Sequence, residues 1–170
     1  MDLNKRLLEF YKKNFKLKKF YNHIPYLDKK DQIELSRCIK STFVSTAGKK
    51  IKDFENHLKK ITRSRYVIPV NSGTSALHLC LLANEINEKH EVLIPSVNFV
   101  ATANAITYVK ADPHFIDVSK SDLNIDFKKL DKYLASLSFK KGLLFNKKTK
   151  KYIKAIIVLH TFGYVANLDE

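Results

Sequence analysis

A turn of small residues, Gly73-Thr74-Ser75, has the residue types that can hold an anion. It follows an apolar run, YVIPV, at residues 66–70, and it opens a helix-like run over residues 74–86. Where a strand turns into a helix, the first backbone N–H groups are free and the positive end of the helix dipole lies beside them. Gly73 lets the backbone approach a ligand, and the two hydroxyl side chains add donors. The turn therefore fits a phosphate cradle, although Ser and Thr are also ordinary helix caps.

Other signatures of a reactive or metal site are missing from the sequence. No G-K-[ST] follows the turn and no G-x-G-x-x-G occurs, which excludes a Walker loop and a dinucleotide fingerprint. The cysteines, Cys38 and Cys80, have neither C-x-x-C spacing nor histidines at metal-binding distance along the chain. Each lies in an apolar helical pattern, which predicts buried free thiols, no metal, and a reducing, cytoplasmic location.

The chain is basic, with 31 Lys and Arg against 17 Asp and Glu and a formal charge of +14. A basic protein can bind nucleic acid or another anionic surface. Arginine, which favours bidentate contacts to phosphates and guanines, occurs only at Arg6, Arg37, Arg63 and Arg65. The lysines are spread along the whole chain, and no RNP-like or zinc-finger motif appears. We therefore expect an anionic small-molecule substrate rather than nucleic acid.

The elements that would position the turn change in character near residue 65. Residues 1–64 contain a basic, aromatic segment at 1–22 and two amphipathic helices, predicted within residues 28–43 and 49–62. From Tyr66 on, short apolar strands alternate with helices, which predicts an α/β unit over residues 65–170 with a mostly parallel sheet and helices on both faces. No secretory signal and no apolar run of roughly 18 residues occurs, so we expect no membrane span.

The predicted strands of that unit are the apolar runs at residues 66–70, 91–95, 113–118 and 154–160. The predicted helices are at residues 74–86, 98–109 and 126–137. Residues 139–153 interrupt the alternation, because two β-like runs flank a polar NKKTKK, and this indicates a surface hairpin.

Several blocks in order resemble the sugar aminotransferases of the DegT/DnrJ/EryC1/StrS family. They are SGTSAL, IPSVNFVATANAI, FIDV, LNID and AIIVLHTFG, preceded by FVSTAGKKIKDFENHL with its Phe54-Glu55 pair. The hairpin insertion resembles the subgroup that aminates UDP-linked 4-keto-6-deoxy sugars for bacillosamine or legionaminic acid synthesis. The resemblance covers about residues 24–170 and implies part of the large domain of a fold type I, aspartate aminotransferase-like enzyme.

The resemblance also implies roles for particular residues. Gly73, Thr74 and Ser75 would hold the phosphate of pyridoxal 5′-phosphate, and Phe99 would stack on its pyridine ring. Asn98 stands where the family usually has Thr, and we expect it to cap the helix that follows. His160 matches a family histidine, but a histidine at a strand end is commonly structural, and we assign it no catalytic role.

Pyridoxal chemistry also needs a Schiff-base lysine and a carboxylate on the pyridine nitrogen. The family has both later in its sequence than the position that Glu170 matches. We therefore expect no catalytic residue in residues 1–170, and no activity from this chain alone. It would be the N-terminal portion of an enzyme that transfers an amino group, with glutamate as donor, to a nucleotide-linked keto sugar for polysaccharide synthesis. Such enzymes are homodimers, and a separately encoded C-terminal half could complete this one. The alternative is an inactive truncated paralogue that serves only as a binding partner.

Overall fold

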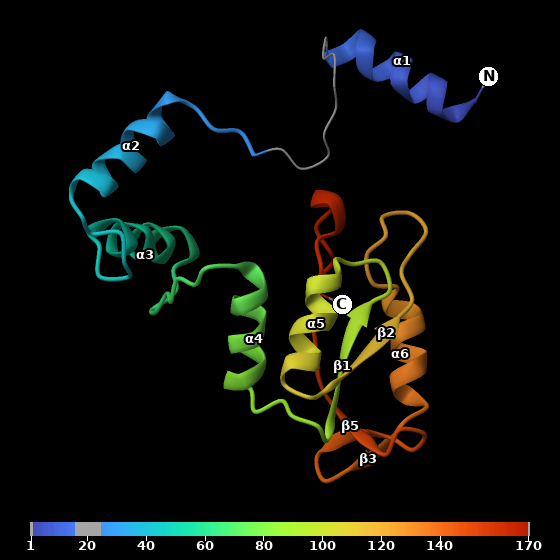
Figure 1. Cartoon of the computed structure of the whole chain (residues 1–170). Coiled ribbons are helices and arrows are strands. Elements are labelled where there is room, and N and C mark those ends of the chain that lie inside the picture. Colours follow the sequence, from blue (N-terminus) through green and yellow to red (C-terminus); the bar gives the residue numbers. More distant parts are fainter. Residues whose placement is uncertain (1, 16–24, 170) are drawn as a thin grey trace. The chain divides into compact units, whose positions relative to one another are not determined.

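A computed structural model describes residues 2–15 and 25–169 of the chain (Figure 1). They form two compact units that divide between Pro69 and Val70. The predicted segment at residues 1–22 is a helix, α1 (Leu3–Phe15), in its described part, and residues 16–22 lie outside the described residues.

The first unit continues with the two predicted helices, α2 (Lys29–Lys40) and α3 (Lys49–Thr62), which are confirmed. Asp28 caps α2 with a reciprocal box: its Oδ1 accepts from the N–H of Asp31 at 3.2 Å, and Asp31 Oδ2 accepts from the N–H of Asp28 at 2.8 Å. Gly48 precedes α3, and a Cβ there would lie 3.0 Å from the carbonyl oxygen of Phe43, so the tight loop favours glycine.

The apolar stripes of these helices are not buried by the described residues. No residue of α2 or α3 is buried, and Phe54 and Ile61 are 52% and 73% exposed. The 3.6-residue pattern thus predicts the two helices correctly. The described residues of the unit do not cover the apolar faces of these helices.

The second unit is an α/β sandwich around one five-stranded sheet in the order β2-β1-β5-β4-β3. The parallel strands are β1 (His90–Pro95), β2 (Asp112–Ile116) and β5 (Lys151–Ile156), with β1 in the middle. The predicted hairpin is confirmed as the antiparallel pair of β4 (Leu143–Asn146) and β5, joined through NKKTKK, and β3 (Ser138–Lys140) is a further antiparallel strand beside β4. The α/β class is therefore confirmed, and the sheet is mixed.

Helices cover both faces of this sheet, as the sequence predicts (Figure 1). On one face α4 (Gly73–Ala83) and α5 (Val100–Tyr108) enclose a cluster around Val92 and Ile94, both fully buried. On the other face α6 (Phe127–Ala135) packs Leu130 against Leu93 and Ile153. β1 is therefore buried on both sides, which explains its unbroken apolar run.

Two sequence expectations are wrong. Residues 66–70 form no strand: Pro69 has no N–H to donate, and Tyr66 and Ile68 are 72% and 79% exposed. The cysteines are free thiols but not buried ones, because Cys80 is exposed on α4 and Cys38 is half-buried on α2. Both lie on helix faces that their own unit leaves largely uncovered. Among the described residues no helix is long and apolar enough to cross a membrane.

Candidate functional site

Two helix N-termini lie at the carboxyl end of β1. β1 ends at Pro95, α4 begins at Gly73 and α5 begins at Val100, and both helices begin at that edge of the sheet (Figure 1). The two helices also pack against each other. In open α/β sheets, ligands bind outside the carboxyl ends of the strands. This edge therefore brings the predicted phosphate turn and the predicted stacking residue to the same side of the unit.

The first turn of α4 is organised by its own side chains. Ser72 is the N-cap residue, and its Oγ accepts from the N–H of Ser75 at 3.2 Å. Ser75 Oγ donates to Oδ1 of Asn71 at 2.8 Å. The hydroxyl and amide of Ser75 are thus already used by the cap. The structure leaves the backbone N–H groups of Gly73 and Thr74, with the Thr74 hydroxyl, without a hydrogen-bond partner among the described residues.

Open space lies beside this turn. A Cβ built on Gly73 would meet no atom within 4 Å, and the residue itself is exposed. The free N–H groups of the first helical turn therefore border an opening into which an anion can enter. The sequence predicted three phosphate-binding residues here, and the geometry favours Gly73 and Thr74 as the donors, with Ser75 holding the turn in shape.

The entry to α5 contains a second unsatisfied group. Phe99 is the N-cap residue and is 74% exposed, so its ring is available at the sheet edge. Asn98 does not cap α5, contrary to expectation; its Nδ2 donates to the carbonyl oxygen of Pro95 at 2.8 Å. Its Oδ1 is buried without a partner among the described residues. Sequence reasoning missed this acceptor, although the departure from the family's Thr marked the position.

The loop after β5 is held rigidly at the same edge. Asn124, 3% exposed, accepts from the N–H of Thr161 and donates to the carbonyl oxygen of Tyr164, each at 3.3 Å. His160 Nδ1 accepts from the N–H of Ala166 at 3.1 Å, a contact that fixes the ring's position. Phe162, with a φ of 52°, sits in the left-handed region and is 84% exposed. The loop thus borders this edge of the sheet, with its backbone held by contacts to Asn124 and His160.

Lys154, a lysine on β5, lies away from this edge. Its Nζ donates to the carbonyl oxygen of Glu85 at 3.3 Å, beyond the carboxyl end of α4. The cradle is at the opposite end of that helix. Lys154 is therefore not placed to reach a group held at Gly73.

Comparison with known proteins gives a consistent match. The profile of the DegT/DnrJ/EryC1/StrS aminotransferase family matches residues 25–170. EpsN of Bacillus subtilis, described as a putative pyridoxal phosphate-dependent aminotransferase, is 31% identical over 90% of this chain and 37% of its own length. A UDP-4-amino-4,6-dideoxy-N-acetyl-beta-L-altrosamine transaminase of Campylobacter jejuni is 35% identical over 88% of this chain and 36% of its own length.

A solved structure supports the same relationship. A DegT DnrJ EryC1 StrS aminotransferase from Brucella abortus superposes with a TM-score of 0.65 at 25% identity, over 86% of this chain and 39% of that one. The chain thus spans little more than a third of the length of the relatives it matches. The family match begins at residue 25, so it does not include α1.

Proposed function

Because the chain belongs to the DegT/DnrJ/EryC1/StrS aminotransferase family, we propose that it forms the N-terminal portion of a pyridoxal 5′-phosphate-dependent nucleotide-sugar aminotransferase. The complete enzyme would transfer an amino group, with glutamate as the donor, to a nucleotide-linked keto sugar used in polysaccharide synthesis. The Campylobacter jejuni transaminase is named for a UDP-linked amino sugar and a relative from Caulobacter vibrioides for GDP-perosamine, so the names support a nucleotide-linked amino sugar as the product.

The observation that carries this proposal is the open cradle at Gly73. Two free backbone N–H groups and the Thr74 hydroxyl surround a space that a Cβ on Gly73 would enter. A phosphate dianion there would satisfy these donors and lie at the positive end of the α4 dipole. The donor set therefore fits the phosphate of the cofactor, whose pyridine ring supplies the electron sink for amino-group chemistry.

Phe99 and Asn98 would complete one wall of the same site. The exposed Phe99 ring offers a flat apolar face against an aromatic ligand, which limits the ligand's tilt and excludes water from one side. The unpartnered Oδ1 of Asn98 is an acceptor that a ligand hydroxyl or a bound water could satisfy. An orphaned buried acceptor and an open donor cradle at one sheet edge are what an absent polar ligand would leave behind.

In this proposal the groups that hold and move protons during transfer come from outside residues 1–170. The relatives extend far beyond the matched region, and we expect their Schiff-base lysine and ring-nitrogen carboxylate there. This chain's residues would bind the phosphate, orient the ring and exclude water. We further propose that the complete enzyme is a homodimer, or that a separately encoded C-terminal half completes it.

Expression of the chain together with the sequence encoded after Glu170, or in an adjacent reading frame, tests the proposal. We expect amino transfer from glutamate to a UDP-linked 4-keto-6-deoxy sugar, and at least about tenfold less to a 2-keto acid, because buried polar groups reject substrates that lack their partners. Association with a full-length family member but no gain of activity would instead support the inactive paralogue.

A further inference from the structure

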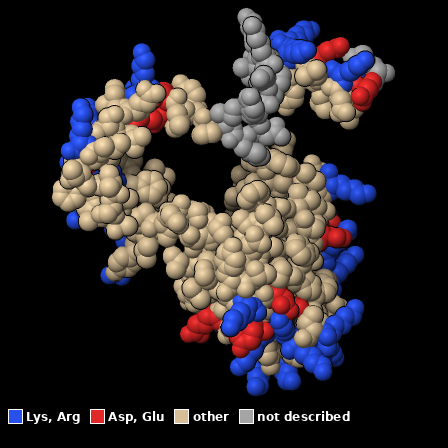
Figure 2. Space-filling view, in the orientation of Figure 1, with Lys and Arg blue, Asp and Glu red and all other residues tan. Residues whose placement is uncertain are grey.

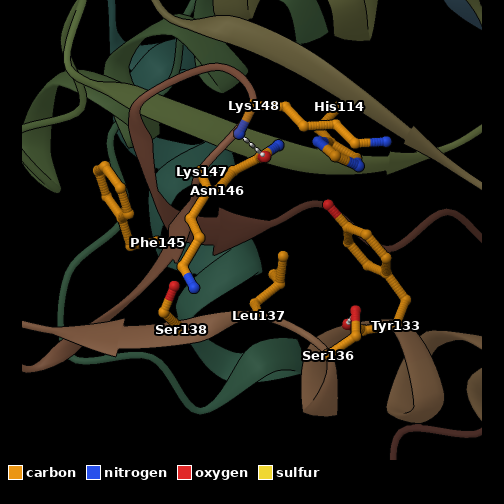
Figure 3. A pocket seen from close by; sticks show the side chains of 9 residues that line it. All are labelled: His114, Tyr133, Ser136, Leu137, Ser138, Phe145, Asn146, Lys147 and Lys148. Carbon is orange, nitrogen blue, oxygen red and sulfur yellow. Dashed lines mark hydrogen bonds between the residues drawn. The ribbon is translucent and has the colours of Figure 1, made fainter.

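A second polar pocket lies at the amino edge of the sheet, opposite to the Gly73 cradle (Figure 3). Its volume is about 540 Å³, within the range of small-molecule sites. Its wall comes from β2, from the carboxyl end of α6 and from the β3–β4 hairpin with the turn that follows. The proposed aminotransferase function uses none of these residues.

The pocket is built on a buried carboxylate. Glu91, 2% exposed, lies beneath it on β1, and its Oε2 is 3.1 Å from Nδ1 of His114 and 3.1 Å from Nδ2 of Asn146. The Asn146 Nδ2 is an amide N–H and donates to this carboxylate, and the His114 ring nitrogen is the second hydrogen-bonding partner of the same oxygen. Asn146 Oδ1 in turn accepts from the N–H of Lys148 at 3.0 Å (Figure 3). Glu91 therefore fixes two residues of the pocket wall and, through Asn146, the start of the lysine-bearing turn.

Most of the polar groups that face this space are hydrogen-bond donors that have no acceptor among the described residues. Lys147 and Lys148 have no carboxylate within ion-pair distance among the described residues. Ser138 Oγ is buried without a partner in the same described part, and Lys147 points toward it (Figure 3). The Tyr133 hydroxyl points toward His114 and likewise has no hydrogen bond among the described residues (Figure 3). Burial, and then the Glu91 carboxylate, raise the pKa of Tyr133, so its hydroxyl remains a donor at neutral pH.

Apolar groups form the rest of the wall. Leu137 and Phe145 line the same cavity, and the Lys140 ammonium lies 5.0 Å from the Phe145 ring centroid. The pocket thus combines two unpaired ammonium groups and several hydroxyl groups with an aromatic and aliphatic surface. That combination suits a ligand with a multiply charged anionic head and an apolar or aromatic body.

We propose that this pocket is a binding site for a small organic phosphate, with the phosphoryl group at Lys147 and Lys148 and the organic body against Phe145 and Leu137. The two ammonium groups, on long flexible side chains, donate to the phosphoryl oxygens, and the hydroxyl groups of Ser138 and Tyr133 lie on either side of them in the pocket (Figure 3). The site is distinct from the Gly73 cradle, and its assignment does not depend on the proposed aminotransferase function.

The competing explanation is a diffuse basic surface. Lys and Arg side chains gather at the lower end of the space-filling view, where β3 and β5 lie in Figure 1 (Figure 2). Such a surface attracts any anion, with affinity that falls steeply with salt and does not depend on one particular lysine. A built pocket instead distinguishes between neighbouring lysines and between ligand bodies.

Titration of the 170-residue chain with phenyl phosphate and with inorganic phosphate, followed by calorimetry and by ³¹P NMR, separates these cases. We expect one phenyl phosphate to bind here, about fivefold tighter than inorganic phosphate, because its ring covers the apolar wall. Lys148→Gln should weaken binding about tenfold, the effect of one lost charge-assisted hydrogen bond, and Tyr133→Phe about threefold.

Two control variants decide the assignment. Lys150→Gln changes an exposed lysine of the same turn that does not line the pocket, and it should leave the affinity within about twofold. Gly73→Val, which fills the other cradle, should remove phosphate bound there but leave the Lys148-dependent binding at this pocket unchanged. Equal losses in Lys150→Gln and Lys148→Gln, loss of the Lys148-dependent binding in Gly73→Val, or equal affinity for both phosphates would each overturn the proposal.

Discussion

Glu91 and Asp112 are partners in the parallel register of β1 and β2, yet only one of the two carboxylates is buried. The Glu91 side chain is 3% exposed and is held by His114 and Asn146. The Asp112 side chain is 50% exposed and lies 2.6 Å from Nζ of Lys151. Two acidic residues at the same level of the sheet therefore make very different contributions to stability.

Replacement of Glu91 should destabilise the fold far more than replacement of its neighbour. Glu91→Leu leaves the Asn146 amide and the His114 ring nitrogen without their buried partner, at a cost of about 3 kcal/mol. Asp112→Asn removes only a partly exposed ion pair, worth about 0.5 kcal/mol. The free energy of unfolding in urea measures both, and similar values for the two variants would contradict the buried network.

His90 should make the stability of the second unit depend on pH. Desolvation, and then the nearby Lys154 charge, lower the pKa of His90 from its ordinary value of 6.5. Its Nδ1 accepts from the N–H of Asn87 at 3.1 Å, and protonation of Nδ1 would break that bond. Below pH 6.5 the unfolded state therefore binds more protons than the folded state, and stability falls as the pH drops from 6.5 through the folded-state pKa.

His90→Asn isolates this effect, because the asparagine oxygen can accept the same hydrogen bond but does not titrate. The difference in unfolding free energy between the wild type and His90→Asn should stay constant above pH 6.5. Below pH 6.5 the wild type should become less stable relative to His90→Asn. A difference that does not change with pH would show that the histidine does not carry the dependence.

Phe99 should contribute to cofactor binding and not to stability. The ring is 74% exposed, so Phe99→Ala should change the free energy of unfolding by less than about 0.5 kcal/mol. Loss of one face of the ring contact should weaken pyridoxal 5′-phosphate binding about threefold to tenfold. Phe139→Ala is the matched control, since Phe139 is also 74% exposed but lies on β3. Equal affinities for the two variants in equilibrium dialysis would remove Phe99 from the site.

Gly73→Val should separate ligand binding from folding in the same way. The Cβ enters open space and valine is the better helix former by about 0.4 kcal/mol, so Gly73→Val should not destabilise the helix, whereas Ala83→Val at the other end of α4 should cost about 0.6 kcal/mol. The two added methyl groups occupy the space assigned to the phosphate, so pyridoxal 5′-phosphate affinity should fall at least about tenfold. Unchanged affinity in Gly73→Val would place the phosphate elsewhere.

The order of helices and strands could be predicted well because local signals and tertiary packing agree. The run EVLIP predicts a doubly buried strand, and NKKTKK between two β-like runs predicts the hairpin; the structure has both. The predicted strand at residues 66–70 does not form because its local apolar signal is not matched by tertiary packing. An apolar run becomes a strand only beside a partner, and the described chain supplies none there.

The candidate site was only partly predictable from the sequence. Glycine and hydroxyl residues at the start of a predicted helix indicated an anion-binding turn, but not that Ser75 is used by the cap. The orphaned oxygen of Asn98 and the Glu91 network depend on contacts that exist only after folding. Glu91 and Asn146 are 55 positions apart, and no local pattern links them.

In the proposed enzyme, residues 1–170 bind the phosphate of pyridoxal 5′-phosphate but do not supply the lysine that forms the Schiff base with its aldehyde. Borohydride reduction of the 170-residue chain with pyridoxal 5′-phosphate, after exhaustive dialysis and followed by peptide mapping, tests that claim most directly. We expect only substoichiometric adducts scattered over surface lysines, while phosphate-dependent binding at Gly73 remains measurable before dialysis. One stoichiometric adduct at a single lysine within residues 1–170, accompanied by amino-transfer activity, would contradict the account.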